Sequence, residues 1–360
     1  MKQYRLLSTM AGALALAAAT AAPLAASAEP LKAAFIYNSP IGDAGWTFAH
    51  NQGRLAAEAN LGDKIKTTYV ESATEGDVER ILLKFANDGY KLIFTTSFGF
   101  MNPTIKAAGT LPGVAFAHAT GYKMADNVGV YHARAYEARY LSGIVAGKMT
   151  KTNVAGFIAS FPIPEVIRGI NAFTQGLRSV NPKATVKVVW VSTWYDPGKE
   201  REAAEALIVQ GADVISQFTD SGAAIQTAEE RGVHAIGVGS DMSRYGQKAH
   251  LTAVIYKWGG FYTKAAQAVI DGSWKAENVW GGLALDMIDL APLNAAVPAD
   301  VAALVAAGRA DIAAGKLHPF QGPVKDQSGA VRVAAGEAMA DGDLLGLNWY
   351  VEGVEGALPQ

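Results

Sequence analysis

The amino-acid sequence predicts an α/β protein made of two doubly wound lobes, each built on a parallel sheet. Short apolar runs alternate with amphipathic segments from residue 32 to residue 314. Such alternation is typical of parallel sheets covered by helices on both faces. The alternation restarts near residue 154, and the 360 residues exceed the usual length of one such domain. Two lobes are therefore expected.

The first series of elements begins with the apolar run 32–37, which is typical of a buried strand. Thr74 and Asp77 resemble a helix capping box, and apolar residues recur after them at helical spacing. The patterns predict strands at 32–37, 66–70, 92–95, 114–117 and 128–131. They predict helices at 47–61, from 74 onward, at 102–109 and at 136–149.

The second series repeats the same order of strand and helix. It predicts strands at 154–159, 186–191, 214–217, 234–238, 251–256 and 283–290. It predicts helices at 164–180, 199–210, 223–231, 259–271 and 301–314, and Gly315 is placed to end the last of these. The expected first crossover is 148–153. Lobe I would then comprise 31–150 plus about 258–283, and lobe II would comprise 151–257 plus about 284–360.

Residues 1–28 predict a secretory signal peptide. Lys2 and Arg5 precede the apolar run 10–25, and Ala26-Ser27-Ala28 is a pattern that signal peptidase cleaves after Ala28. The run is too short and too rich in Ala to favour a membrane anchor. The sequence has no Cys to carry a lipid anchor or a disulfide. A soluble protein of the bacterial periplasm is expected.

Composition and motifs argue against catalysis and against nucleic-acid binding. The formal net charge is −2, with 31 basic and 33 acidic residues, so no basic face for nucleic acid is expected. The six His are scattered without metal-ligand spacing. The sequence contains no Gly-x-Ser-x-Gly elbow, no phosphate-binding loop and no dinucleotide fingerprint. We therefore expect no enzyme activity, no cofactor and no metal.

The predicted ligand site follows from what lies after the strands, because open parallel sheets place ligands at the carboxyl ends of their strands. These positions carry Asn38, Asp43, Trp46, Ser97 and Phe98 in the first lobe, and Trp194, Asp220, Asp241 and Lys257 in the second. One Trp from each lobe can hold a flat ring, and carboxylate or amide groups can bind its N–H edges. The alternative for Trp46 is packing at the start of its helix. His118, Glu165 and Tyr136 stay open between cleft lining and scaffold.

Several segments resemble the basic membrane protein family of ABC-transporter substrate-binding proteins, whose best-understood members bind purine nucleosides. These segments are 38–46, 140–143, 154–158, 194–197, 235–241, 322–326 and 353–356. The resemblance implies a type I periplasmic-binding fold with a three-strand hinge. It implies that Trp46 and Trp194 sandwich a purine where nucleoside binders use Phe, with polar contacts from Asn38, Asp43, Asp241 and Lys257. It also implies an ABC permease of the inner membrane as partner, and a monomer is expected.

Two departures from the family pattern bear on the ligand. Nucleoside binders carry a ribose-binding Asp in the segment matching 116–120, and this chain has none there. They also tend to have Asp-x-Asp where this chain has Gly239-Ser240-Asp241. We therefore predict a purine nucleobase (adenine, hypoxanthine or guanine), held by lobe closure with Asp220 at a ring N–H. A nucleoside-binding member, a periplasmic nucleoside hydrolase and a sensor subunit remain the alternatives.

Overall fold

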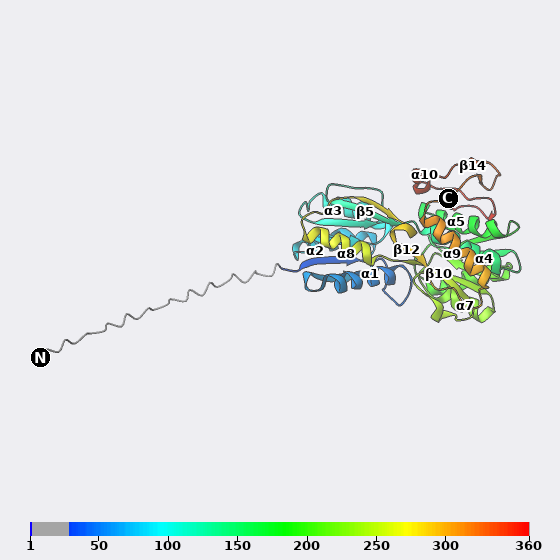
Figure 1. The fold of residues 1–360 in the computed structure, drawn as a ribbon, viewed down its shortest axis with the longest axis horizontal. Coiled ribbons are helices and arrows are strands. Elements are labelled where there is room, and N and C mark those ends of the chain that lie inside the picture. The colour runs from blue at the N-terminus through cyan, green and yellow to red at the C-terminus, as the bar shows by residue number, and fades with distance from the viewer. Residues whose placement is uncertain (2–28, 360) are drawn as a thin grey trace.

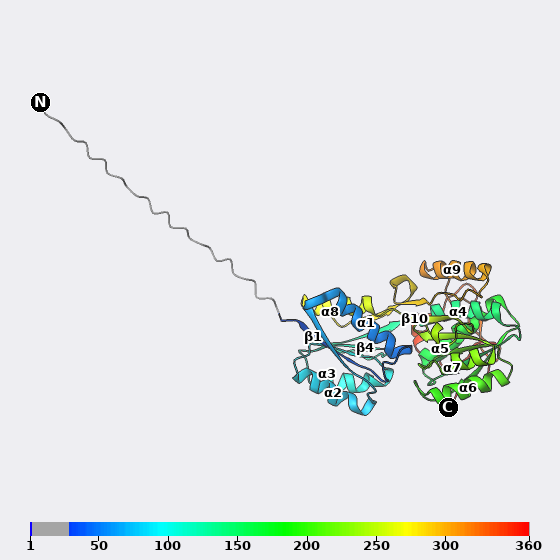
Figure 2. The same cartoon turned by 90° about the horizontal axis from the view of Figure 1, so that it is seen from below.

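The computed structural model describes Met1 and residues 29–359. The predicted signal peptide, apart from Met1, lies outside the described residues. Two lobes lie side by side, each with its own central sheet (Figure 1, Figure 2). In the described part of the chain, no helix has both the length and the apolar character that a membrane span requires.

The first lobe is built on a six-stranded sheet in the order β11-β5-β4-β3-β1-β2, and all of its strand pairs are parallel. Its strands are β1 (Leu31–Ile36), β2 (Ile65–Val70), β3 (Leu92–Thr95), β4 (Ala115–Ala119), β5 (Val128–Ala133) and β11 (Asn278–Gly281). Its helices are α1 (Gly45–Leu61), α2 (Glu75–Asn87), α3 (Met101–Ala108) and α8 (Gly259–Ile270). Helices α1 and α8 cover one face of the sheet, and α2 and α3 cover the other (Figure 2).

Neighbouring strand residues supply the two cores of this lobe, because successive side chains of a strand point to opposite faces. Phe35 stacks on Phe94 with ring centroids 4.5 Å apart and meets the edge of Tyr262 at 5.0 Å on the α8 side. Ile36 and Ile93 pack in the opposite core with α2 and α3. The predicted capping box at Thr74 and Asp77 is confirmed at the start of α2.

The second lobe is built on a seven-stranded sheet in the order β12-β10-β9-β8-β6-β7-β15. Strand β12 is antiparallel to β10, and the other pairs are parallel. The strands are β6 (Val154–Ala159), β7 (Thr185–Trp190), β8 (Val214–Gln217), β9 (His234–Gly239), β10 (His250–Tyr256), β12 (Ile288–Leu290) and β15 (Val354–Glu355). The helices are α4 (Ala135–Met149), α5 (Pro164–Val180), α6 (Pro197–Val209), α7 (Ala223–Arg231) and α9 (Ala299–Ala313).

The chain passes between the lobes three times: between β5 and α4, between β10 and α8, and between β11 and β12. The crossings are tied to one another by backbone hydrogen bonds. The Arg134 N–H donates to the Gly281 carbonyl at 2.7 Å, and the Lys257 N–H donates to the Met287 carbonyl at 3.0 Å. The predicted architecture of two doubly wound lobes with three crossovers is confirmed.

Helix α4 lies in the second lobe, whereas the division expected from the sequence assigned residues 136–149 to the first. The helix packs against α5 at very short range. A Cβ added to Gly176 would lie 1.9 Å from the Tyr140 carbonyl oxygen, and one added to Gly143 would lie 2.1 Å from the Phe173 carbonyl oxygen. Only glycine allows this approach. The first crossover therefore precedes α4, near Arg134, and does not lie at 148–153.

The C-terminal part of the chain also departs from the expected elements. The predicted strand 283–290 is a short 3₁₀ turn at Leu283–Leu285 followed by β12. Beyond α9, the small strands β13 (Val324–Lys325) and β14 (Val331–Val333) and the short helix α10 (Asp341–Leu345) pack on the second lobe (Figure 1). Arg134 at the first crossing binds the Asp341 carboxylate through two hydrogen bonds of 2.7 and 2.6 Å.

Candidate functional site

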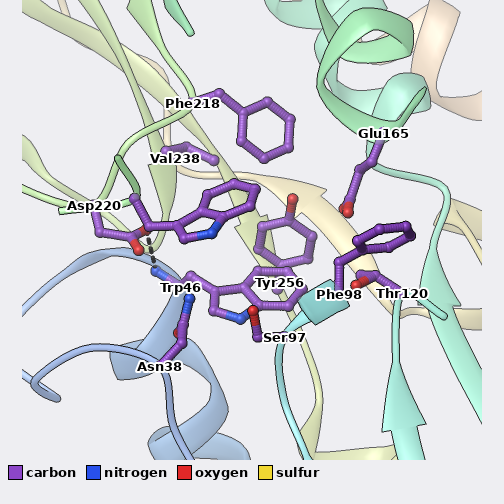
Figure 3. A pocket seen from close by; sticks show the side chains of 11 residues that line it. Asn38, Trp46, Ser97, Phe98, Thr120, Glu165, Phe218, Asp220, Val238 and Tyr256 are labelled. Carbon is purple, nitrogen blue, oxygen red and sulfur yellow. Dashed lines mark hydrogen bonds between the residues drawn. The ribbon is translucent and has the colours of Figure 1, made fainter. Parts of the chain in front are cut away.

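A pocket lies between the lobes at the carboxyl ends of both sheets, where doubly wound folds bind ligands. It contains about 420 Å³ of space, part of which is open to solvent. Five of its eleven lining residues are aromatic and five carry polar groups, and most of its surface is apolar (Figure 3). The lining residues are Asn38, Trp46, Ser97, Phe98, Thr120, Glu165, Trp194, Phe218, Asp220, Val238 and Tyr256. An apolar pocket with few polar groups is typical of a small-molecule site.

Trp46 is held rigidly at the start of α1. Its backbone N–H donates to Oδ1 of Asp220 at 2.7 Å, and its indole Nε1–H donates to the Thr96 carbonyl at 2.6 Å. The indole also meets Tyr256 edge-on, with centroids 4.9 Å apart and an interplanar angle of 85°. Because both the backbone N–H and the indole N–H of Trp46 are bonded, the ring is oriented before any ligand arrives. This rigidity lowers the entropic cost of binding.

Trp194 lines the pocket from the second lobe, in the loop between β7 and α6. Its ring packs against Phe161 at 5.2 Å with an interplanar angle of 55°. Its carbonyl accepts a hydrogen bond of 2.9 Å from the Asp220 N–H, so the loops that carry Trp194 and Asp220 are joined. The structure therefore brings one Trp from each lobe to the same pocket.

Asp220 follows β8 and lies buried in the lining of the pocket. Its Oδ1 accepts from Trp46, whereas its buried Oδ2 has no hydrogen-bond partner. Burial raises the pKa of this carboxyl to about 7; the Trp46 N–H opposes that rise, and the nearby Glu200 carboxylate adds to it. A buried oxygen without a partner is costly, and a ligand N–H would satisfy it.

The lobes touch each other beside this pocket. Asp43 of the first lobe forms an ion pair of 2.8 Å with Arg244 of the second and also accepts a hydrogen bond from the Tyr245 hydroxyl. A Cβ added to Gly239 would lie 2.2 Å from the Gly45 carbonyl carbon. Glycine at both positions thus allows the two backbones to meet, which is the arrangement expected of a closed cleft.

Six of the predicted ligand-binding residues line the pocket. They are Asn38, Trp46, Ser97, Phe98, Trp194 and Asp220. The structure does not bring the other three predicted residues to the pocket lining, and each has a protein partner. Asp43 binds Arg244, Asp241 accepts a hydrogen bond of 2.9 Å from the Ser243 N–H, and Lys257 forms an ion pair with Asp286.

The structure also places the three residues whose role the sequence left open, and it adds lining residues that the sequence did not predict. Glu165 lines the pocket, whereas His118 bonds Thr95 at 2.9 Å and Tyr136 bonds Arg134 at 2.7 Å, both as buried scaffold. The missed lining residues are Thr120, Phe218, Val238 and Tyr256. Thr120 has a left-handed backbone conformation with φ of 64°.

In the described residues 29–359, no group of three or more His, Cys, Asp or Glu is arranged to hold a metal ion.

The chain matches known proteins over most of its length. The profile of the PnrA-like ABC transporter substrate-binding proteins (Bmp) matches residues 31–312. A purine-binding protein of Brucella abortus is 51% identical over 333 residues, covering 92% of this chain and 95% of that protein. A Haloferax volcanii protein provisionally named an ABC transporter glucose-binding protein is 40% identical over 332 residues, covering 92% of this chain and 82% of that protein.

Solved structures support the fold. An ABC transporter solute-binding protein of Aeropyrum pernix superposes with a TM-score of 0.70 at 19% identity, covering 82% of this chain and 93% of that chain. At this identity the likeness concerns the fold alone, which is the type I periplasmic-binding fold that the sequence predicted. The family consists of substrate-binding proteins and not of enzymes. The chain belongs to the PnrA-like (Bmp) family of ABC transporter substrate-binding proteins.

Proposed function

We propose that the protein is the periplasmic binding component of an ABC importer for a purine nucleobase, which it holds between Trp46 and Trp194. The observation that carries the proposal is the unpartnered Oδ2 of Asp220 inside an aromatic pocket. A ring stacked on an indole gains about 0.5–1.5 kcal/mol beyond burial. A hydrogen bond from its N–H to the Asp220 carboxylate contributes about 1.5–3 kcal/mol.

Two considerations support a base over a nucleoside, and the name of one relative supports a purine. The family resemblance implied polar contacts from Asp43, Asp241 and Lys257, and these side chains are bound to protein groups outside the pocket. The position that carries a ribose-binding Asp in nucleoside binders falls within 116–120, where the pocket has only the hydroxyl of Thr120. The relative from Brucella abortus is named as a purine-binding protein. A sugar is the second candidate, because the relative from Haloferax volcanii carries a glucose-binding name.

Calorimetric titration of the purified protein separates these candidates. Adenine, hypoxanthine and guanine are compared with adenosine, inosine and glucose under identical conditions, after any co-purified ligand is removed by partial unfolding and refolding. The proposal expects at least one base to bind at least tenfold more tightly than its nucleoside and far more tightly than glucose. Tighter binding of adenosine than of adenine, or binding of glucose alone, would contradict it. Incubation with inosine should release no ribose.

A further inference from the structure

Glu165 is a carboxyl group in the pocket that the family resemblance does not use. It lies in the first turn of α5, and its side chain points into the pocket near Phe98 and Tyr256, on the side opposite Asp220 (Figure 3). Burial raises its pKa, which the positive charges of Arg168 and Arg139 oppose, and no hydrogen bond contributes. Its oxygens are thus available to a ligand.

The two arginines that attract Glu165 are engaged elsewhere. Arg168 donates to the Leu344 carbonyl at 2.6 Å and lies over the Trp280 ring, 5.0 Å from its centroid. Arg139 donates to the Ser216 hydroxyl at 3.2 Å and to the Gln217 carbonyl at 2.9 Å. Neither guanidinium forms an ion pair with Glu165 within 4.0 Å among the described residues. The protein therefore positions the Glu165 carboxyl group but provides no hydrogen-bond or ion-pair partner for it among the described residues.

The hydroxyl of Tyr256 is a second unsatisfied group on this side of the pocket. It is buried and has no hydrogen-bond partner. Its ring is fixed, because it stacks on Trp258 at 5.4 Å with an interplanar angle of 9° and meets Trp46 edge-on at 4.9 Å. Burial and the charge of Glu165 both raise its pKa, so the hydroxyl stays protonated and can donate.

We infer that Glu165 and Tyr256 form a second polar anchor that selects a purine with an exocyclic amino group. The amino group donates to the Glu165 carboxylate, and the Tyr256 hydroxyl donates to the adjacent ring nitrogen. Asp220 has only Oδ2 free, so it binds a single N–H on the opposite edge, a group that all free purine bases have. A 6-oxo group would instead place a carbonyl oxygen against the Glu165 carboxylate. This inference rests on the proposed function.

The test is Glu165→Gln, measured by calorimetry with adenine and hypoxanthine. The amide loses the charged acceptor for an amino group and gains a donor for a carbonyl. We expect the wild type to prefer adenine and this preference to fall at least about tenfold in the variant. Glu202→Gln on α6 is the matched control, because Glu202 is exposed and does not line the pocket. It should leave both affinities unchanged.

Tyr256→Phe provides a second test that does not depend on the stability of the Gln variant. Because the hydroxyl has no protein partner, its removal should not lower Tm, yet it should weaken adenine binding at least about fivefold. The inference is overturned if the wild type prefers hypoxanthine, if Glu165→Gln lowers both affinities equally, or if neither variant alters the preference. Those outcomes leave the proposed function standing. Failure of the wild type to bind any purine would overturn both.

Discussion

Replacing Asp220 with Asn should separate binding from stability. The Asn oxygen must keep the hydrogen bond from the Trp46 N–H, because an amide nitrogen cannot accept it. The amide NH₂ then takes the position of Oδ2 and opposes the ligand N–H, donor against donor. The loss of one charge-assisted hydrogen bond, about 1.5–3 kcal/mol, corresponds to a decrease in affinity of roughly 10- to 150-fold. Calorimetry at pH 8 measures it.

The same variant should be more stable than the wild type when no ligand is bound. The folded-state pKa of Asp220, about 7, lies above its ordinary value of 3.8. The wild type therefore loses stability as pH rises between these values, and at pH 8 it carries the full cost of a buried carboxylate near Glu200. Asn removes that charge, so Tm should rise at pH 8 by roughly 2 °C or more, and by less at pH 5.

Two results would show that Asp220 does not bind the ligand in this way. The first is an affinity for purine bases that stays within about threefold of the wild type, which would mean that Oδ2 does not meet the ligand. The second is a lower Tm for the ligand-free variant at pH 8, which would mean that the carboxylate is satisfied within the protein. Asp241→Asn is the matched control, because Asp241 binds the Ser243 N–H outside the pocket. It should leave affinity unchanged.

Three further substitutions test the site. Trp194→Ala should weaken the binding of a purine base by about 2–4 kcal/mol in calorimetry, from lost stacking and burial, and an unchanged affinity would exclude the sandwich. Gly239→Ala places a Cβ 2.2 Å from the Gly45 carbonyl carbon, so the variant's lobes should stay apart. Small-angle scattering of the variant should show no compaction when ligand is added, and compaction equal to that of the wild type would contradict this expectation. Lys257→Ala, which removes the exposed ion pair to Asp286, should leave ligand affinity within about twofold. A large loss of affinity would indicate that Lys257 contacts the ligand.

The alternation of strands and helices was predictable because buried parallel strands read as short apolar runs, and helices carry their own period and caps. The lobe to which α4 belongs was not predictable from the sequence. Its periodicity shows a helix but does not show which sheet the helix covers. The decisive contact joins Gly143 and Gly176 to carbonyl oxygens of the opposite helix, and such a pairing between two helices leaves no signal in the periodicity of either one.

Part of the pocket lining was likewise predictable from the sequence, and part was not. Strand-end position was sufficient to predict that Trp46, Trp194 and Asp220 lie in one pocket, since doubly wound folds bring those ends together. Position could not reveal that Asp43 pairs with Arg244, about 200 residues away and in the other lobe. Tyr256 was missed because the prediction considered residues that follow the strands, whereas Tyr256 is the last residue of β10 itself. In a strand buried on both faces, polarity does not show which side chain faces the pocket.

A crystal structure of the protein with adenine would show directly whether Trp46 and Trp194 hold a purine ring between them. We expect the purine ring between the indoles of Trp46 and Trp194, with a ring N–H within about 3 Å of Oδ2 of Asp220. The exocyclic amino group should lie on the side of Glu165. A purine bound outside this pocket, or an Asp220 Oδ2 that bonds a protein group while the ring occupies the pocket, would contradict the proposed binding mode.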